Sequence, residues 1–254
     1  MTEKANHPIK SVEKTVRIVE ALKRRRSARL RELAEDLEMN KSTVHNHLST
    51  LREHEYVVKE AEEYRLSLSF LHIGGILRNE VELYEAAKPK LDRLAGETGE
   101  LVTLATEERG LGVVLYRARG EEAVEIDTHV GSQLTLHNSA LGKAILAHLP
   151  RERVEAILDN RGLPATTDNT ITDEATLFEE LDRIEEQGYA FDDEENWRGL
   201  RCVGAPILTD TGVVEGAISL SVPKNRLADE SARQAYVDEI KNTANLVELS
   251  ITYS

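Results

Sequence analysis

The stretch SVEKTVRIVEALKRRRSARLRELAEDLEMNKSTVHNHLSTLRE, residues 11–53, decides the fold of the first part of the chain. Apolar residues recur there every three or four positions in three segments, which predicts helices over 11–23, 29–38 and 41–53. The expected apolar stripe of the first helix consists of Val12, Val16, Val19 and Leu22. Asn40, directly before the third segment, is a residue type favoured at the start of a helix. A first helix followed by two short helices with a tight turn between them is therefore predicted.

The third predicted helix presents polar side chains because its apolar residues, Val44, Leu48 and Leu51, turn inward. In a helix-turn-helix, the second helix of the motif, which is the third predicted helix here, enters the major groove of DNA. Hydroxyls near a helix N-terminus suit phosphate, and an asparagine side chain pairs with an adenine edge. The DNA-contact candidates are Lys41, Ser42, Thr43, His45, Asn46 and His47. A solvated helix face is the alternative interpretation. The basic run 23–26 is a second candidate, for contact with the DNA backbone, and a solvated run of charges is the alternative there.

The domain organisation follows from a change of pattern along the chain. Short apolar stretches at 56–58 and 64–66 flank an acidic turn and predict a hairpin, the wing of a winged helix-turn-helix over residues 1–66. Residues 67–80 are predicted to connect this domain to a second one over 81–254. There a helix over 78–95 is expected first, then strands at 101–106, 112–118 and 123–128. Further helices at 139–148, 151–158, 174–187 and 229–250 and strands at 201–208 and 214–222 predict an α+β domain with an antiparallel sheet.

The charge of the chain is divided unevenly between these parts. The net charge is -14, yet residues 1–66 carry 14 basic and 12 acidic side chains, whereas the rest carries 18 and 34. Binding to DNA draws on neutralisation of phosphates by lysine and arginine. Only the N-terminal part is therefore suited to lie beside a phosphate backbone. The acidity of the remainder indicates either adaptation to high salt or an ordinary acidic protein.

Several classes of function are disfavoured. No apolar run is long enough to cross a membrane and no apolar signal core precedes the first helix, so we expect a cytoplasmic protein. The single cysteine, Cys202, excludes an internal disulfide and a cysteine-rich metal site. Neither a glycine-rich phosphate loop nor histidines at metal-ligand spacing is present, and we expect no metal and no cofactor.

Four stretches in this order resemble the isocitrate lyase regulator (IclR) family of transcription factors: SVEKTVRIVEAL, RELAEDLEMNKSTVHNHLSTL, LHNSALGKAILA and DDEENWRGLRCVGAPILTDTGVVEGAISLSVP. The resemblance covers about Ser11 to Ser254. It implies a winged helix-turn-helix, a linker helix used in dimerisation, and a GAF-like effector-binding domain. It also implies a regulator that binds double-stranded operator DNA as a homodimer or homotetramer and responds to a small molecule. We expect that effector to be a carboxylate or a sugar-derived catabolite.

The same resemblance transfers effector-binding positions to Ala140, Leu141, Asp192, Cys202, Ser219 and Ser221. The backbone amides of Ala140 and Leu141 would receive a carboxylate, which agrees with the anion preference of helix N-termini. Ser219 and Ser221 are two apart on a predicted strand and share one face. Each position has a structural alternative: hydroxyls that satisfy backbone groups, an aspartate that caps a turn, and a cysteine that packs as a small apolar residue. Gly142 and Lys143 are interpreted as structural.

Two other classes of function are alternatives to a regulator, and the sequence favours neither. A thiol-dependent enzyme would need a histidine near Cys202 to lower its pKa, and the local sequence RGLRC supplies arginine only. Neither an enzyme nor an adaptor that binds proteins through an acidic face explains residues 11–66. The sequence therefore predicts no enzymatic activity. It leaves open the effector, the target genes, the choice between repressor and activator, and the choice between dimer and tetramer.

Overall fold

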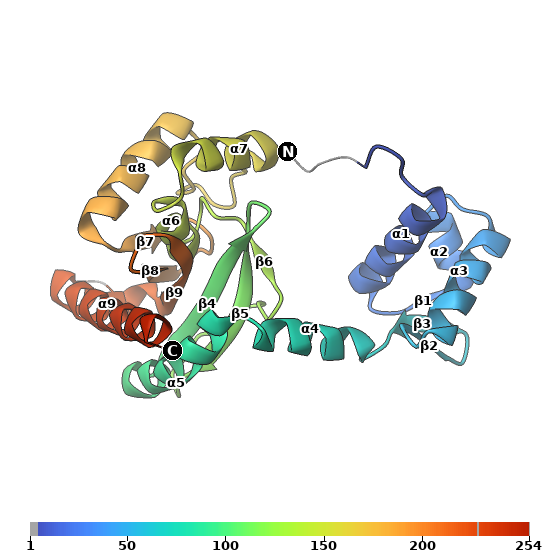
Figure 1. The fold of residues 1–254 in the computed structure, drawn as a ribbon, viewed down its shortest axis with the longest axis horizontal. Helices are drawn as coiled ribbons and strands as arrows, with labels where there is room; N and C mark the ends of the chain where they lie inside the picture. The colour runs from blue at the N-terminus through green and yellow to red at the C-terminus, as the bar shows by residue number, and fades with distance from the viewer. Residues whose placement is uncertain (1–4, 228, 254) are drawn as a thin grey trace. The chain divides into compact units, whose positions relative to one another are not determined.

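The computed structural model describes residues 5–227 and 229–253. Contacts within the chain group it into two compact units that divide between Leu77 and Arg78 (Figure 1). Each unit has its own apolar core.

The N-terminal unit consists of three helices and a three-stranded sheet of order β1-β3-β2. Its helices are α1 (Lys10–Arg25), α2 (Leu30–Asp36) and α3 (Lys41–Glu53), and its strands are β1 (Ala28–Arg29), β2 (Val57–Glu60) and β3 (Glu63–Leu66). Side chains from all three helices and from β3 meet in the core, among them Ile18, Leu22, Leu33, Val44, Leu48 and Tyr64. The predicted winged helix-turn-helix is thus observed, with the third helix at the predicted bounds.

The buried face of α1 differs from the expected stripe. Ile18, Ala21 and Leu22 are buried, whereas Val12 and Val16 are each 55% exposed. The core of this unit is small and receives only the second half of α1. The apolar surface at the start of α1 therefore remains in solvent.

The wing is a tight hairpin in which β2 and β3 pair antiparallel, with Val57 opposite Leu66 at one end and Glu60 opposite Glu63 at the other. Its turn places Ala61 at a positive φ of 52°, a backbone conformation that glycine adopts more readily. Arg65 pairs with Glu60 across the hairpin, so part of the negative charge of the wing is neutralised within the wing itself. After the wing, α4 (Ser69–Asn79) contains no buried residue.

The C-terminal unit is built on a six-stranded antiparallel sheet of order β6-β5-β4-β9-β8-β7. The strands are β4 (Leu101–Glu108), β5 (Leu111–Arg119), β6 (Gln133–Leu134), β7 (Ala190–Asp193), β8 (Leu200–Leu208) and β9 (Val214–Pro223). Helices cover both faces, which confirms the predicted α+β class with an antiparallel sheet (Figure 1).

Two helices, α5 (Glu82–Thr98) and α9 (Glu230–Thr252), pack against one face of this sheet. They bury one apolar cluster that includes Leu91, Leu94, Ile218, Leu220 and Val247. The opposite face carries α6 (Ala140–Leu146), α7 (Arg151–Arg161) and α8 (Glu174–Gln187) over a second cluster. The 3-10 turn η1 (Lys224–Leu227) follows β9. The sheet thus separates two cores, and α6 packs against the neighbouring strands β8 and β9.

One predicted strand, 123–128, is wrong. This segment has no strand partner and is irregular. Its alternating apolar residues, Val124 and Ile126, instead pack against the second cluster. The edge of the sheet is supplied by the two-residue β6, which pairs with Gly112 and Val113 of β5. Alternating apolar residues can therefore pack against a core without belonging to a strand.

Candidate ligand pocket and nucleic-acid interface

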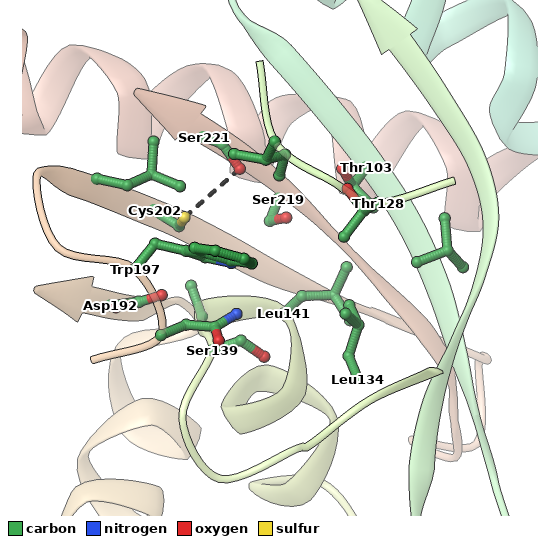
Figure 2. A pocket seen from close by; sticks show the side chains of 15 residues that line it. Thr103, Thr128, Leu134, Ser139, Leu141, Asp192, Trp197, Cys202, Ser219 and Ser221 are labelled. Atoms are coloured by element: carbon green, nitrogen blue, oxygen red, sulfur yellow. Dashed lines mark hydrogen bonds between the residues drawn. The ribbon is translucent and has the colours of Figure 1, made fainter. Parts of the chain in front are cut away.

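A cavity of about 40 Å³ lies between the start of α6 and the sheet. All six residues expected to bind an effector line it (Figure 2): Ala140, Leu141, Asp192, Cys202, Ser219 and Ser221. They come from α6 and from three strands, β7, β8 and β9. A volume of this size holds a few water molecules, so any larger ligand requires the pocket to widen.

The register of the sheet explains why the polar side chains converge. Ser221 of β9 lies opposite Cys202 of β8, which lies opposite Asp192 of β7. Ser219 belongs to the next row on the same face, opposite Gly204 of β8 and Thr103 of β4. Residues paired across an antiparallel sheet point to one face, as do residues two apart on a strand. The sheet therefore directs four hydroxyl, thiol or carboxyl groups toward α6.

The start of α6 contributes backbone donors to this cavity. The hydroxyl of Ser139 accepts a hydrogen bond from the amide of Gly142 at 3.1 Å. The carbonyl of Ser139 accepts from the amide of Lys143 at 2.8 Å. The two amides before these, of Ala140 and Leu141, have no acceptor within the helix. They are therefore the donors that remain for a ligand.

Two glycines permit this close approach of the helix to its surroundings. A Cβ at Gly204 would lie 2.8 Å from the backbone of Ala140, so any side chain there would push α6 away from β8. A Cβ at Gly142 would lie 2.2 Å from the carbonyl oxygen of Leu136. The structural interpretation of Gly142 follows directly from this contact.

Asp192 is the one ionisable carboxyl group among the predicted effector residues. It is 2% exposed, and its Oδ1 accepts a hydrogen bond of 2.7 Å from the amide of Glu195. Burial raises the pKa of Asp192 to about 7, and the charge of Glu195 adds to the rise. At neutral pH the carboxyl group is therefore present in both forms, and its protonated form donates a hydrogen bond.

Cys202 lies beside this carboxyl group with its thiol 3.4 Å from the Ser221 hydroxyl. Burial and the neighbouring Asp192 raise the pKa of the thiol well above its usual value. A nucleophilic cysteine needs the thiolate form. The surroundings of Cys202 therefore oppose a thiol-dependent activity.

A buried ion pair lies next to Asp192, outside the lining of the cavity. Lys143 is 1% exposed, and its Nζ lies 2.5 Å from Oε1 of Glu195 and 3.4 Å from Oε1 of Glu180. The other oxygen of Glu195, Oε2, is buried without a partner among the described residues. Burial raises the pKa of Glu195. The pair joins α6 and α8 to the segment after β7, which agrees with a structural role for Lys143.

Sequence reasoning missed several lining residues. Thr103, Thr128, Ser139 and Trp197 also face the cavity. Figure 2 shows the ring of Trp197 reaching across the pocket near Cys202. Trp197 is 45% exposed and lies in the loop between β7 and β8. Nothing in the local sequence links these positions, because strand register and loop path bring them together.

The six DNA-contact candidates all lie in the first two turns of α3. Lys41, Ser42, His45 and Asn46 are exposed, and Thr43 is half-buried. Val44, Leu48 and Leu51 face the core as expected. The exposed positions form a polar surface on the side of α3 away from the core. This surface offers hydrogen-bond donors and acceptors of the kind that contact bases and phosphates.

His47 differs from the other candidates. Its Nδ1 lies 2.9 Å from the hydroxyl of Thr15 on α1, so its ring is held toward the neighbouring helix. In the basic run, Arg25 forms a two-point ion pair with Asp36 and Lys23 pairs with Glu20. Part of this basic charge is therefore neutralised within the unit.

Two other features are absent from the described residues. No cluster of three or more histidine, cysteine, aspartate or glutamate side chains is placed to hold a metal ion. Among the helices of residues 5–227 and 229–253, none is long and apolar enough to span a membrane.

Comparison with known proteins identifies both units. Residues 11–61 match the family model described as the IclR helix-turn-helix domain, and residues 76–249 match the bacterial transcriptional regulator IclR C-terminal model. The chain is 34% identical over 247 residues to a probable HTH-type transcriptional regulator ArcR of Halobacterium salinarum, covering 96% of this chain and 94% of that protein. It is 30% identical over 253 residues to the regulator KdgR of Escherichia coli, covering 99% and 96%.

Solved structures agree with these matches. The IclR protein of Thermotoga maritima superposes with a TM-score of 0.76 at 28% identity, covering 94% of this chain and 96% of that one. An IclR homologue from Microbacterium hydrocarbonoxydans, solved in complex with 4-hydroxybenzoate, has a TM-score of 0.82 at 23% identity, covering 96% and 100%. The two named relatives are transcriptional regulators, as expected for a chain without enzymatic activity.

Proposed function

The chain belongs to the IclR family of DNA-binding transcriptional regulators with an effector-binding C-terminal domain, and from this premise we propose how it acts. It binds an operator near a promoter as a homodimer or a dimer of dimers, and a small carboxylate-bearing molecule or sugar-derived catabolite alters that binding. It acts in the cytoplasm, where the DNA lies. The observation that carries the proposal is the convergence of all six expected effector residues on one cavity.

The DNA-binding step rests on the exposed polar surface of α3. Lys41 and Ser42 suit phosphates at the helix N-terminus, whereas Asn46 suits a base edge. The charge distribution supports the same assignment, because only residues 1–66 carry a net positive charge, of +2. We expect few phosphate contacts for this reason, since each one depends on a basic side chain.

The oligomer is supported by an apolar surface that a monomer leaves in solvent. Within α4, Leu71 is 72% exposed, Leu77 is 59% and Ile76 is 48%. Contiguous exposed apolar residues mark surfaces that bind another protein. A second copy of the chain is the partner that the family implies. Two-fold symmetry would present two copies of α3 to an inverted-repeat operator.

The effector step rests on the chemistry of the pocket. The amides of Ala140 and Leu141 offer donors to a carboxylate without a cationic side chain. Ser219 and Ser221 add hydroxyls, and Asp192 selects a ligand that bears a hydroxyl or another polar group. The Microbacterium homologue holds 4-hydroxybenzoate, which is itself a carboxylate with a hydroxyl group. Binding changes DNA affinity only to the extent that the ligand prefers one arrangement of the dimer.

The test of this function begins with a map of the sites that the protein binds across its genome, followed by footprinting of the bound promoters. The expected result is a protected inverted or partly palindromic repeat, with the two half-sites about one helical turn of DNA apart or a multiple of it. Catabolic genes beside the site would identify the class of effector. A protein that protects no site near the genes it affects, at any salt concentration, contradicts the proposal.

A further inference from the structure

Arg117 of β5 lies beside the effector pocket, although neither its sequence neighbourhood nor the family resemblance singled it out. It pairs across the sheet with Thr103, which in turn pairs with Ser219. Paired residues share a face of an antiparallel sheet, so the side chain of Arg117 stands on the pocket face. Its Nη1 donates a hydrogen bond to the carbonyl of Thr128. Both threonines, Thr103 and Thr128, line the pocket.

The guanidinium of Arg117 retains buried donors that the protein does not satisfy. Its Nε and Nη2 are buried without a hydrogen-bond partner among the described residues, and so is the hydroxyl of Thr128. No described carboxylate forms an ion pair with Arg117, and the charged group that acts on it is another cation, Arg119. A half-buried charge without a counter-ion, and with two of its three nitrogens lacking a hydrogen-bond partner, is unfavourable. Such a group is stabilised when an anion binds.

These contacts define a second point of attachment at a distance from α6. Figure 2 shows Thr103 and Thr128 on the opposite side of the pocket from Ser139 and Leu141. The amides at the start of α6 suit one carboxylate, and they lie at that other side. The two parallel N–H groups of an arginine match the two oxygens of a carboxylate or of a phosphate-like group. A ligand that satisfies both points must therefore carry an acidic group at each end.

We propose that Arg117 and the hydroxyl of Thr128 form a second anion subsite, so that the effector is a small acid with two anionic groups. One group binds the amides of Ala140 and Leu141, and the other binds Arg117. The inference rests on the proposed function of the pocket and narrows its ligand class. Arg117 is thus a specificity-determining residue that separates diacids from monoacids of the same length.

The experiment is calorimetric titration with matched pairs of acids. Malonate, succinate and glutarate are compared with propanoate, butanoate and pentanoate, which lack the second carboxylate. 3-Phosphonopropanoate, matched to succinate, distinguishes a phosphate-like second group from a carboxylate. At least one diacid is expected to bind the wild type tenfold or more tightly than its monoacid partner.

Variants assign that preference to the subsite. Arg117→Gln is expected to remove the preference for the diacid and to leave the affinity for the monoacid unchanged. Thr128→Val keeps the carbonyl that Arg117 binds and removes only the hydroxyl, so it should weaken the diacid severalfold in a folded protein. Arg119→Gln is the matched control, because Arg119 is 48% exposed and faces Glu125 at 3.7 Å. It makes the same change of charge and should bind the diacid as the wild type does.

Several results overturn the inference: no diacid binds, diacids bind no better than monoacids, or neither Arg117→Gln nor Thr128→Val lowers the preference. Failure of the proposed pocket has a different signature. If the acids bind the wild type and lose affinity in Ser219→Ala/Ser221→Ala, but Arg117→Gln leaves the preference for the diacid unchanged, the pocket stands and the second subsite falls. If the serine variant binds every acid as the wild type does, the pocket itself is wrong.

Discussion

The polar groups on the exposed surface of α3 and those of the pocket beneath α6 lie in opposite environments. Along α3, Lys41, Ser42 and Asn46 are exposed, and water satisfies them when DNA is absent. In the C-terminal unit, Asp192 and Lys143 are buried. A buried polar group destabilises the fold unless other groups compensate for it. Substitutions on α3 should therefore change function alone, whereas substitutions around the pocket should change stability as well.

The largest effect is expected where the buried ion pair between Lys143 and Glu195 is broken. Lys143→Met leaves Glu195 buried without a cation, and the free energy of unfolding should fall by about 3 to 5 kcal/mol. Chemical denaturation measures the change. The double variant Lys143→Met/Glu195→Gln removes both charges and should recover most of the loss.

An exposed pair provides the control for this prediction. Lys88 and Asp92 are 2.8 Å apart on α5 with both side chains 44% exposed, so Lys88→Met should cost less than about 1 kcal/mol. Equal losses at Lys143 and Lys88, or a double variant no more stable than Lys143→Met, would refute the difference drawn between buried and exposed groups.

An intermediate effect is expected at Asp192, and it depends on pH. Its folded pKa of about 7 lies above the usual value of 3.8, so the folded state binds the proton more tightly. The contribution of this group to stability is thus present at low pH and is lost as pH rises toward 7. Asp192→Asn removes the loss, and its stability relative to the wild type should rise by about 2 kcal/mol between pH 5 and pH 8.

A carboxylate with the opposite shift tests the sign. Asp173 caps α8, and hydrogen bonds from Thr176 hold its pKa below the usual value. Asp173→Asn should therefore lose stability relative to the wild type as pH rises through that lowered pKa. Unfolding curves for Asp192→Asn that differ from the wild type by the same amount at both pH values would show that Asp192 is not desolvated as described.

The smallest effect on stability is expected on α3. Asn46→Ala and Thr43→Ala replace side chains outside the core, and each should change the free energy of unfolding by less than about 0.5 kcal/mol. Each should nevertheless weaken binding to the specific operator by about 1 to 3 kcal/mol, with the oligomer intact. Operator affinity, set beside unfolding and oligomer mass, separates the two effects. Unchanged operator affinity in both variants would contradict the assignment of operator contacts to α3.

The sequence predicted those elements best whose signals are local. The third helix and the helix over 174–187 have the predicted bounds, because apolar spacing and capping residues mark them directly. Asn40 does occupy the N-cap position of α3, although its side chain forms no capping hydrogen bond. The segment 123–128 misled because alternation reports burial on one side and not the presence of a strand partner.

The pocket was predictable only in part, for a physical reason. Strand periodicity predicts that Ser219 and Ser221 share a face, but only the family resemblance predicted that they lie near Asp192. The sequence did not predict that Arg117 and Thr103 lie at the pocket, because pairing between β5, β4 and β9 is set by contacts between residues distant in sequence. Local patterns contain no record of that register.

The most direct test of the account measures operator affinity with and without a small acid that changes DNA binding by the wild type. The same titration is made with Ser219→Ala/Ser221→Ala, whose α3 is unaltered. The account predicts equal operator affinity for the two proteins without the acid, and a shift on adding the acid that the double variant loses. A double variant whose operator affinity shifts by the same factor at the same acid concentration would contradict the assignment of the effector to this pocket.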